Sequence, residues 1–125
     1  MERKILIVDD EAHIRMLIEQ TLEELEDEGV SFLTAENGED ALRIINDEKP
    51  QLVFLDVMMP KMNGMEVCRK VKKELLLDQV YIVLLTAKGQ EVDRLKGQEV
   101  GADIYLTKPF DPETLLERAK TVLGI

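Results

Sequence analysis

The chain contains the stretch Leu52-Val53-Phe54-Leu55-Asp56, in which four consecutive apolar residues end in a carboxylate. A run this short and this continuously apolar is typical of a strand that is buried on both faces of a parallel sheet. Four similar runs occur along the sequence, at Ile5–Val8, Val30–Thr34, Val80–Leu85 and Ile104–Leu106. We therefore expect five strands, each covered on both faces by other parts of the fold.

Helical patterns separate these runs. Apolar residues spaced by three or four occur in five segments: Ile14–Leu25, the residues after Gly38, the residues after Gly64, Val92–Val100 and Pro112–Val122. Strand followed by helix, five times over, predicts one doubly wound α/β domain spanning residues 1–125, with a five-stranded parallel sheet and five helices in a flavodoxin-like arrangement. The acidic run Glu23–Glu28 is expected to be the solvated end of the first helix.

The composition narrows the classes of function. Of the 125 residues, 45% are apolar and 34% are charged, which is typical of a globular domain. A net charge of −10 argues against a surface for nucleic acid or for an anionic membrane. Cys68 is the only cysteine and lies in helical core spacing, so we expect a buried, unpaired thiol. The first apolar run is too short for a signal peptide or a membrane span, so a cytoplasmic location is expected.

Polar residues follow the predicted strands. Asp9, Asp10 and Glu11 follow the first strand, and Asp56, Thr86 and Lys108 end three others. Ligands of such sheets bind outside the carboxyl ends of the strands. Any one of these acids could simply cap a helix. Three carboxylates and a lysine in one crevice are harder to explain as caps, because the carboxylates repel one another unless a hard cation such as Mg²⁺ lies between them.

This set of groups suits phosphoryl transfer. A carboxylate can attack a phosphoryl group and form an aspartyl phosphate, while a metal, an ammonium and a hydroxyl stabilise the charge on the phosphoryl oxygens. Asp56 is the most plausible nucleophile because it ends the central and most hydrophobic run.

Five ordered motifs resemble the receiver domain of two-component response regulators, over essentially the whole chain. They are Asp9-Asp10-Glu11, Asp56-Val57-Met58-Met59-Pro60, Asn63-Gly64, Thr86-Ala87-Lys88 and Thr107-Lys108-Pro109-Phe110. The resemblance implies that Asp56 is the phosphoacceptor, and that Asp9, Asp10, Asp56 and the backbone carbonyl of Met58 contact Mg²⁺. It also implies that Thr86 is the switch hydroxyl, that Lys108 binds the phosphoryl group, that Tyr105 is the aromatic switch residue, and that Lys108–Pro109 is a cis peptide bond.

The resemblance further implies a partner and a signal. The phosphodonor would be a sensor histidine kinase or a phosphotransfer protein, and the surface of the fourth helix, fifth strand and fifth helix would change on phosphorylation. The chain would be a phosphoacceptor rather than an enzyme, although it promotes its own phosphorylation and its slow dephosphorylation. In the family, the side chains at the positions of Met58 and Lys88 flank the path of the hydrolytic water. Neither carries a carboxylate or amide that could align that water, so we expect slow loss of the phosphoryl group.

The sequence departs from the common pattern in two places. The segment from Asp10 to Val30 is about one helical turn longer than usual, and Ile104 stands where many DNA-binding regulators carry a second acid. The single histidine, His13, is expected at the surface. The residues leave open whether the chain is a stand-alone regulator or a receiver within a longer protein.

Three other classes fit less well. A phosphatase of the haloacid-dehalogenase type would carry an acid where Met58 stands. A flavodoxin-like nucleotide carrier would need a phosphate-binding loop after the first strand, where Asp9 and Asp10 would repel a bare phosphate. A degenerate receiver that serves only for docking would not be expected to keep Asp9, Asp10, Asp56, Thr86 and Lys108 together.

Overall fold

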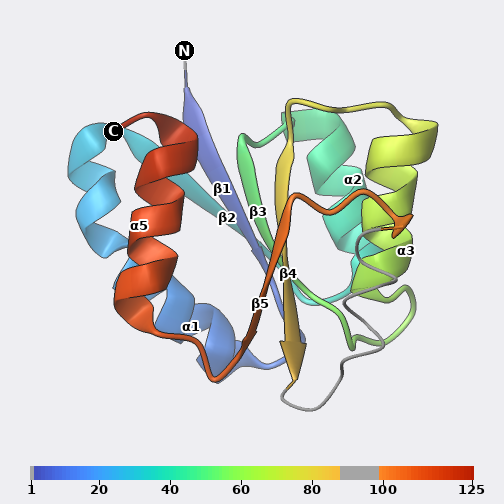
Figure 1. Ribbon diagram of the computed structural model, residues 1–125, viewed down its shortest axis with the longest axis horizontal. Coiled ribbons are helices and arrows are strands. Elements are labelled where there is room, and N and C mark those ends of the chain that lie inside the picture. The colour runs from blue at the N-terminus through green and yellow to red at the C-terminus, as the bar shows by residue number, and fades with distance from the viewer. Residues whose placement is uncertain (1, 88–98) are drawn as a thin grey trace.

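The structure is a computed structural model, and it describes residues 2–87 and 99–125. Five parallel strands form one sheet in the order β2-β1-β3-β4-β5 (Figure 1). The strands are β1 (Arg3–Val8), β2 (Val30–Ala35), β3 (Leu52–Asp56), β4 (Tyr81–Ala87) and β5 (Ile104–Lys108). All four pairs of neighbouring strands run parallel, which confirms the predicted doubly wound sheet.

Helices cover both faces of the sheet. The described helical elements are α1 (Ala12–Thr21), η1 (Glu23–Glu28), α2 (Gly38–Glu48), α3 (Gly64–Arg69), η2 (Lys70–Glu74) and α5 (Pro112–Leu123). α1 and α5 lie on one face, and α2 and α3 lie on the other (Figure 1). The helix predicted over Val92–Val100 falls almost wholly outside the described residues. Among the residues that are described, no helix is long and apolar enough to cross a membrane.

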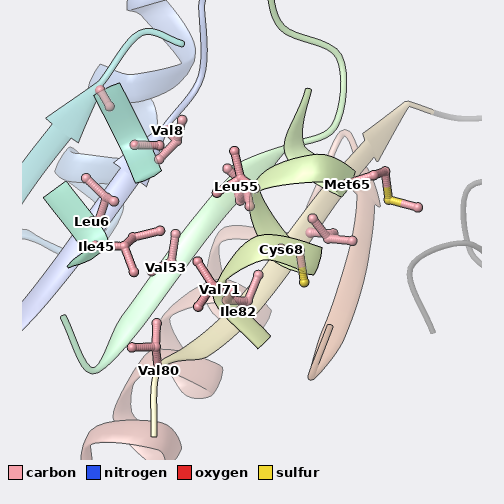
Figure 2. Packing of buried hydrophobic residues seen from close by; sticks show 14 of the residues in the cluster. Leu6, Val8, Ile45, Val53, Leu55, Met65, Cys68, Val71, Val80 and Ile82 are labelled. Atoms are coloured by element: carbon pink, nitrogen blue, oxygen red, sulfur yellow. The ribbon is translucent and has the colours of Figure 1, made fainter. Parts of the chain in front are cut away.

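The alternation of each strand divides the apolar residues into two cores. Beneath α2 and α3, strand residues such as Leu6, Val53 and Ile82 pack against Ile45 and Cys68 (Figure 2). A second core lies beneath α1 and α5 and is built from the other residues of the same strands. Cys68 is fully buried, as predicted, and burial raises the pKa of its thiol to about 12.

The acidic run Glu23–Glu28 does not continue the first helix, so that prediction was wrong in part. α1 ends at Thr21, and the run forms the separate 3-10 helix η1, whose carboxylates are solvated as expected. Gly29, in the left-handed conformation, ends η1 directly before β2, and Leu22 and Leu25, three residues apart, are both fully buried. In a 3-10 helix residues i and i+3 eclipse each other, so both leucines can face the same core.

An ion pair between a buried lysine and a more exposed aspartate fixes the starts of β4 and β5. The ammonium of Lys72, which is only 8% exposed, donates to the carbonyl of Val80 at 2.6 Å and lies 2.8 Å from the carboxylate of Asp103. The Asp103 carboxylate also accepts from the backbone N–H of Ile82 at 2.8 Å. The pair therefore joins the π-helical turn η2 to the edge of the sheet opposite the carboxyl ends of the strands.

Candidate functional site

Three predicted site residues meet because their strands place them on the same side of the sheet. Asp56 is the last residue of β3 and Lys108 the last of β5, whereas Asp9 follows β1 directly. Counting in steps of two along each strand, all three continue the series of apolar residues that face α1 and α5. Their side chains therefore leave the carboxyl edge of the sheet on one side.

Lys108 connects two of the carboxylates. Its Nζ lies 2.8 Å from Oδ2 of Asp9 and 3.2 Å from Oδ1 of Asp56. Asp9 is fully buried and Asp56 is 6% exposed, so this ammonium is the cation that compensates two charges in a poorly solvated place. The Lys108–Pro109 peptide bond is cis, as the resemblance implied.

The strand-end acids are not helix caps. α1 begins after Glu11, which makes no capping hydrogen bond with its side chain, and α3 is capped by Asn63 instead of Asp56. Asp9 accepts the backbone N–H of Glu11 at Oδ1 (2.9 Å), which leaves Oδ2 to Lys108. Asp10 is exposed beside them. The simpler interpretation of these acids as caps is therefore wrong.

Close backbone packing holds the loop after β3 against Asp56. A Cβ atom on Gly64 would lie 2.2 Å from the carbonyl oxygen of Asp56, so only glycine fits at the start of α3. The N–H of Gly64 donates to the carbonyl of Val57 at 2.9 Å, and Asn63 caps the helix by accepting from Glu66 N–H at 2.9 Å. The Asn63-Gly64 motif thus fixes the backbone on which Asp56 is carried.

The charges of the site perturb one another. Burial, followed by repulsion from Asp9, raises the pKa of Asp56 from 3.8 to about 6, although Lys108 opposes the change. For Lys108, burial lowers the pKa, but the hydrogen bond to Asp9 and the attraction of Asp56 outweigh it and raise the pKa overall. At neutral pH the site therefore holds an ionised but destabilised Asp56 carboxylate beside a protonated amine.

Thr86 and Tyr105 lie on the other side of the sheet. Thr86 is 3% exposed and pairs with Thr107, while Tyr105 pairs with Leu84, two residues before Thr86 in β4. Thr86 and Tyr105 therefore belong to the same face of adjacent strands. Tyr105 is partly buried and packs against the core beneath α2 and α3. Asp56 pairs with Leu85, so Thr86 follows the partner of Asp56 and lies one residue before the end of β4.

The rim of the site has both apolar and polar parts. Met58 is 63% exposed, and Lys88 lies outside the described residues. A hollow of about 270 Å³ opens next to Lys108 and is lined by Ile14, Leu17, Ala87, Lys108, Pro109 and Phe110. His13 is exposed, as predicted, and its ring lies 3.3 Å from the Glu11 carboxylate.

Two residues of the site had no assigned role in the sequence analysis: Glu11, which was named only as part of a motif, and Arg15, which was not named. Glu11 contributes a carboxylate oxygen to the group formed with Asp9 and Asp10. Arg15 donates from Nη1 to the backbone carbonyl of Asp9 at 2.7 Å. The position of Arg15 was a usable signal, because long side chains in the first turns of a helix lean back toward its N-terminus, which here is the end of β1.

The donor set fits a hard cation. Asp9, Asp10 and Glu11 each offer one carboxylate oxygen, and these three atoms lie within 4.8 Å of one another. Oxygen ligands, several of them anionic, are what Mg²⁺ prefers. The Lys108 ammonium between Asp9 and Asp56 shows in addition that a positive charge is stabilised at this edge of the sheet.

Comparison with known proteins agrees with this geometry. The family model "Response regulator receiver domain" matches residues 5–120. The transcriptional regulatory protein PhoP of Bacillus subtilis, named for alkaline phosphatase synthesis, is 45% identical, covering 98% of this chain and 49% of its own length. The phosphate regulon regulator PhoB of Pseudomonas aeruginosa is 47% identical, covering 97% of this chain and 52% of its own length. The chain thus spans about half the length of these relatives.

Solved receiver structures share the fold over their whole length. The BeF3-activated DrrB receiver domain is 40% identical with a TM-score of 0.83, and each chain covers 100% of the other. The receiver domain of NtrX from Brucella abortus is 32% identical with a TM-score of 0.81, covering 96% of this chain and 98% of its own. The chain belongs to the receiver domains of two-component response regulators, signalling domains whose general function is to be phosphorylated on an aspartate by kinases.

Proposed function

We propose that residues 1–125 act as one receiver domain and that Asp56 is its phosphoacceptor. The observation that carries this proposal is the position of the Lys108 ammonium, 2.8 Å from Asp9 and 3.2 Å from Asp56, at the carboxyl edge of the sheet. Of these two buried carboxylates, Asp56 is the one with some exposure to solvent, and Lys108 contacts it at Oδ1. An incoming phosphorus atom can therefore reach Asp56 more easily than Asp9.

In the proposed reaction an ionised oxygen of Asp56 attacks phosphorus, and the bond from phosphorus to the donor nitrogen or oxygen breaks. The leaving group takes the bonding electron pair and is protonated from solvent. Lys108 keeps its proton, because its pKa is raised, and moves from Asp56 to a phosphoryl oxygen. The Thr86 hydroxyl contacts another phosphoryl oxygen. The chain thus promotes its own phosphorylation without being a turnover enzyme.

Receiver domains generally bind Mg²⁺ at an acidic pocket. In this chain we propose that Asp9, Asp10, Asp56 and the backbone carbonyl of Met58 hold the ion. The carboxylate of Glu11 lies within 4.8 Å of those of Asp9 and Asp10. When bound, Mg²⁺ neutralises charge on the phosphoryl oxygens and on the clustered carboxylates. The chain's own contribution is to hold these acids within reach of one another before any donor arrives.

Phosphorylation of the purified protein tests the assignment. Acetyl phosphate or a histidine kinase should add one acid-labile, hydroxylamine-sensitive phosphoryl group, detected by intact mass, in a reaction that needs Mg²⁺. Asp56→Asn should abolish it, whereas Asp47→Asn, the same change at an exposed position of α2, should not. Full phosphorylation of the Asp56→Asn protein would contradict the assignment.

We propose that the signal passes from Thr86 to Tyr105. Thr86 would move toward the phosphoryl group, and Tyr105 would turn into the space that it leaves, since both lie on the same face of adjacent strands. Addition of beryllofluoride, a phosphoryl mimic, should shift NMR signals mainly between residues 86 and 118. Shifts confined to the rim around Asp56 would count against this route.

The phosphodonor is proposed to be a sensor histidine kinase or a phosphotransfer protein that docks over the apolar hollow beside Lys108. The exposed face of α1, where Leu17 is 43% exposed, borders this hollow and offers apolar area next to the reacting carboxylate. The relatives are named transcriptional regulators, yet this chain has a net charge of −10. We therefore propose that residues other than these 125 make any contact with DNA. We also propose that phosphorylation takes place in the cytoplasm.

A further inference from the structure

Within the described residues, Lys108 contacts the carboxylates of the acidic pocket, whereas Arg15 contacts its backbone. Arg15 lies on the first turn of α1, and its side chain is 16% exposed. Nη1 donates to the backbone carbonyl of Asp9 at 2.7 Å, while Nη2 approaches the exposed carboxylate of Glu36 at 3.4 Å. The first contact is short and charge-assisted, whereas an exposed ion pair such as the second contributes little.

The carbonyl that Arg15 holds belongs to the peptide unit between Asp9 and Asp10. That unit is planar, so fixing its oxygen fixes the last backbone torsion of Asp9 and the first of Asp10 together. These two torsions set the directions in which the two Cα–Cβ bonds leave the chain. Arg15 therefore acts on the relative orientation of two carboxylates at once.

The rest of Asp9 is anchored independently. Its N–H donates to the carbonyl of Ala35 at 3.3 Å, and its carboxylate accepts from Glu11 N–H and from Lys108. None of these three contacts is made to the carbonyl of the Asp9–Asp10 peptide, which Arg15 holds. Asp10 is exposed, so the direction of its side chain depends strongly on that peptide.

We propose that Arg15 is a positioning residue for divalent-cation binding: it orients the Asp9–Asp10 peptide so that both carboxylates point to one ion. The proposal rests on the proposed function, since it concerns the same acidic pocket. A positioning role and a purely electrostatic role predict opposite changes in Mg²⁺ affinity when Arg15 is removed. A cation near the pocket repels Mg²⁺, so charge alone predicts that its removal strengthens binding. Positioning predicts that its removal weakens binding.

Titration calorimetry of the metal-free protein with Mg²⁺ shows whether the loss of Arg15 weakens or strengthens Mg²⁺ binding. Outer-shell partners of metal ligands typically change metal affinity 10- to 100-fold, so Arg15→Met should weaken Mg²⁺ binding by about tenfold or more. Arg15→Lys keeps a charged donor and should recover part of the affinity. Arg43→Met removes an equally charged but exposed arginine of α2, and Glu36→Gln removes the weak second contact of Arg15. Both should leave Mg²⁺ affinity within about twofold of the parent.

A second measurement needs no metal. Without Arg15 the Asp9–Asp10 peptide should move more freely, so the Glu11 N–H, which donates to Asp9, should exchange with solvent faster in the Arg15→Met protein. Its exchange in Arg43→Met should match the parent. Urea unfolding in EDTA checks that the Arg15→Met protein remains folded under the titration conditions.

The outcomes separate the two proposals. Equal or tighter Mg²⁺ binding by Arg15→Met, with the parent binding normally, would overturn the positioning role and leave the phosphoacceptor site intact. A parent protein that binds no Mg²⁺ would overturn both. Weaker binding in Arg15→Met together with partial recovery in Arg15→Lys is the result that we expect.

Discussion

Replacing Asp56 with asparagine should stabilise the metal-free protein at neutral pH, although it removes the proposed phosphoacceptor. Burial and the neighbouring Asp9 raise the pKa of Asp56 from 3.8 to about 6 in the native state. The native state therefore binds this proton more tightly than the unfolded chain does. The contribution of Asp56 to stability is fully present below pH 3.8 and is lost as the pH rises through about 6.

The size of the effect follows from that difference. At about 1.4 kcal/mol for each pH unit, the gap between 3.8 and about 6 corresponds to an upper limit of roughly 3 kcal/mol at pH 7.5. Asparagine resembles the protonated form in size and lack of charge, so Asp56→Asn should raise the free energy of unfolding by about 1–3 kcal/mol. With a typical urea dependence, the unfolding midpoint should rise by roughly 1 M.

Urea unfolding in EDTA, followed by circular dichroism, measures this gain. It should fall to about half at pH 5, where native Asp56 is mostly protonated. Saturating Mg²⁺ should reduce or reverse it, because a ligand at 100 times its Kd stabilises the parent by about 2.7 kcal/mol. Asp47→Asn, at an exposed site, serves as the control. An Asp56→Asn protein that is no more stable than the parent in EDTA at pH 7.5 would refute the argument from burial and repulsion.

Three further perturbations have distinct outcomes. Gly64→Ala forces a Cβ atom against the carbonyl of Asp56 and should lower the free energy of unfolding by about 1–3 kcal/mol, measured in urea; an unchanged midpoint would contradict the close packing. The double change Met58→Asn with Lys88→Glu supplies groups that can align water and should speed loss of the phosphoryl group about tenfold at fixed Mg²⁺. If loss is no faster, these side chains do not set the lifetime. Leu17→Ser should slow phosphotransfer from the kinase several-fold but leave phosphorylation by acetyl phosphate unchanged, and an equal effect on both donors would exclude a docking role.

The parallel sheet, and the meeting of Asp9, Asp56 and Lys108 at its edge, could be predicted from the sequence. Fully apolar runs such as Leu52–Leu55 can be satisfied only between two layers of helices, and that requirement is local enough to be visible in the chain. The carboxyl ends of parallel strands share one edge, so Asp9, Asp56 and Lys108 were expected to meet there, and they do.

Three other features depend on contacts between segments that are distant in the sequence, and only the folded structure shows them. The separate helix η1 at Glu23–Glu28 could not be predicted from the local pattern, because the spacing of the buried residues Ile18, Leu22 and Leu25 equally suits a continued α-helix. The raised pKa of Asp56 required its burial beside Asp9, 47 positions away in the chain. The hydrogen bond from Arg15 to the Asp9 carbonyl likewise depends on how α1 is placed relative to the end of β1. Periodicity specifies which face of an element is buried, but only the folded chain fixes the distances between charges.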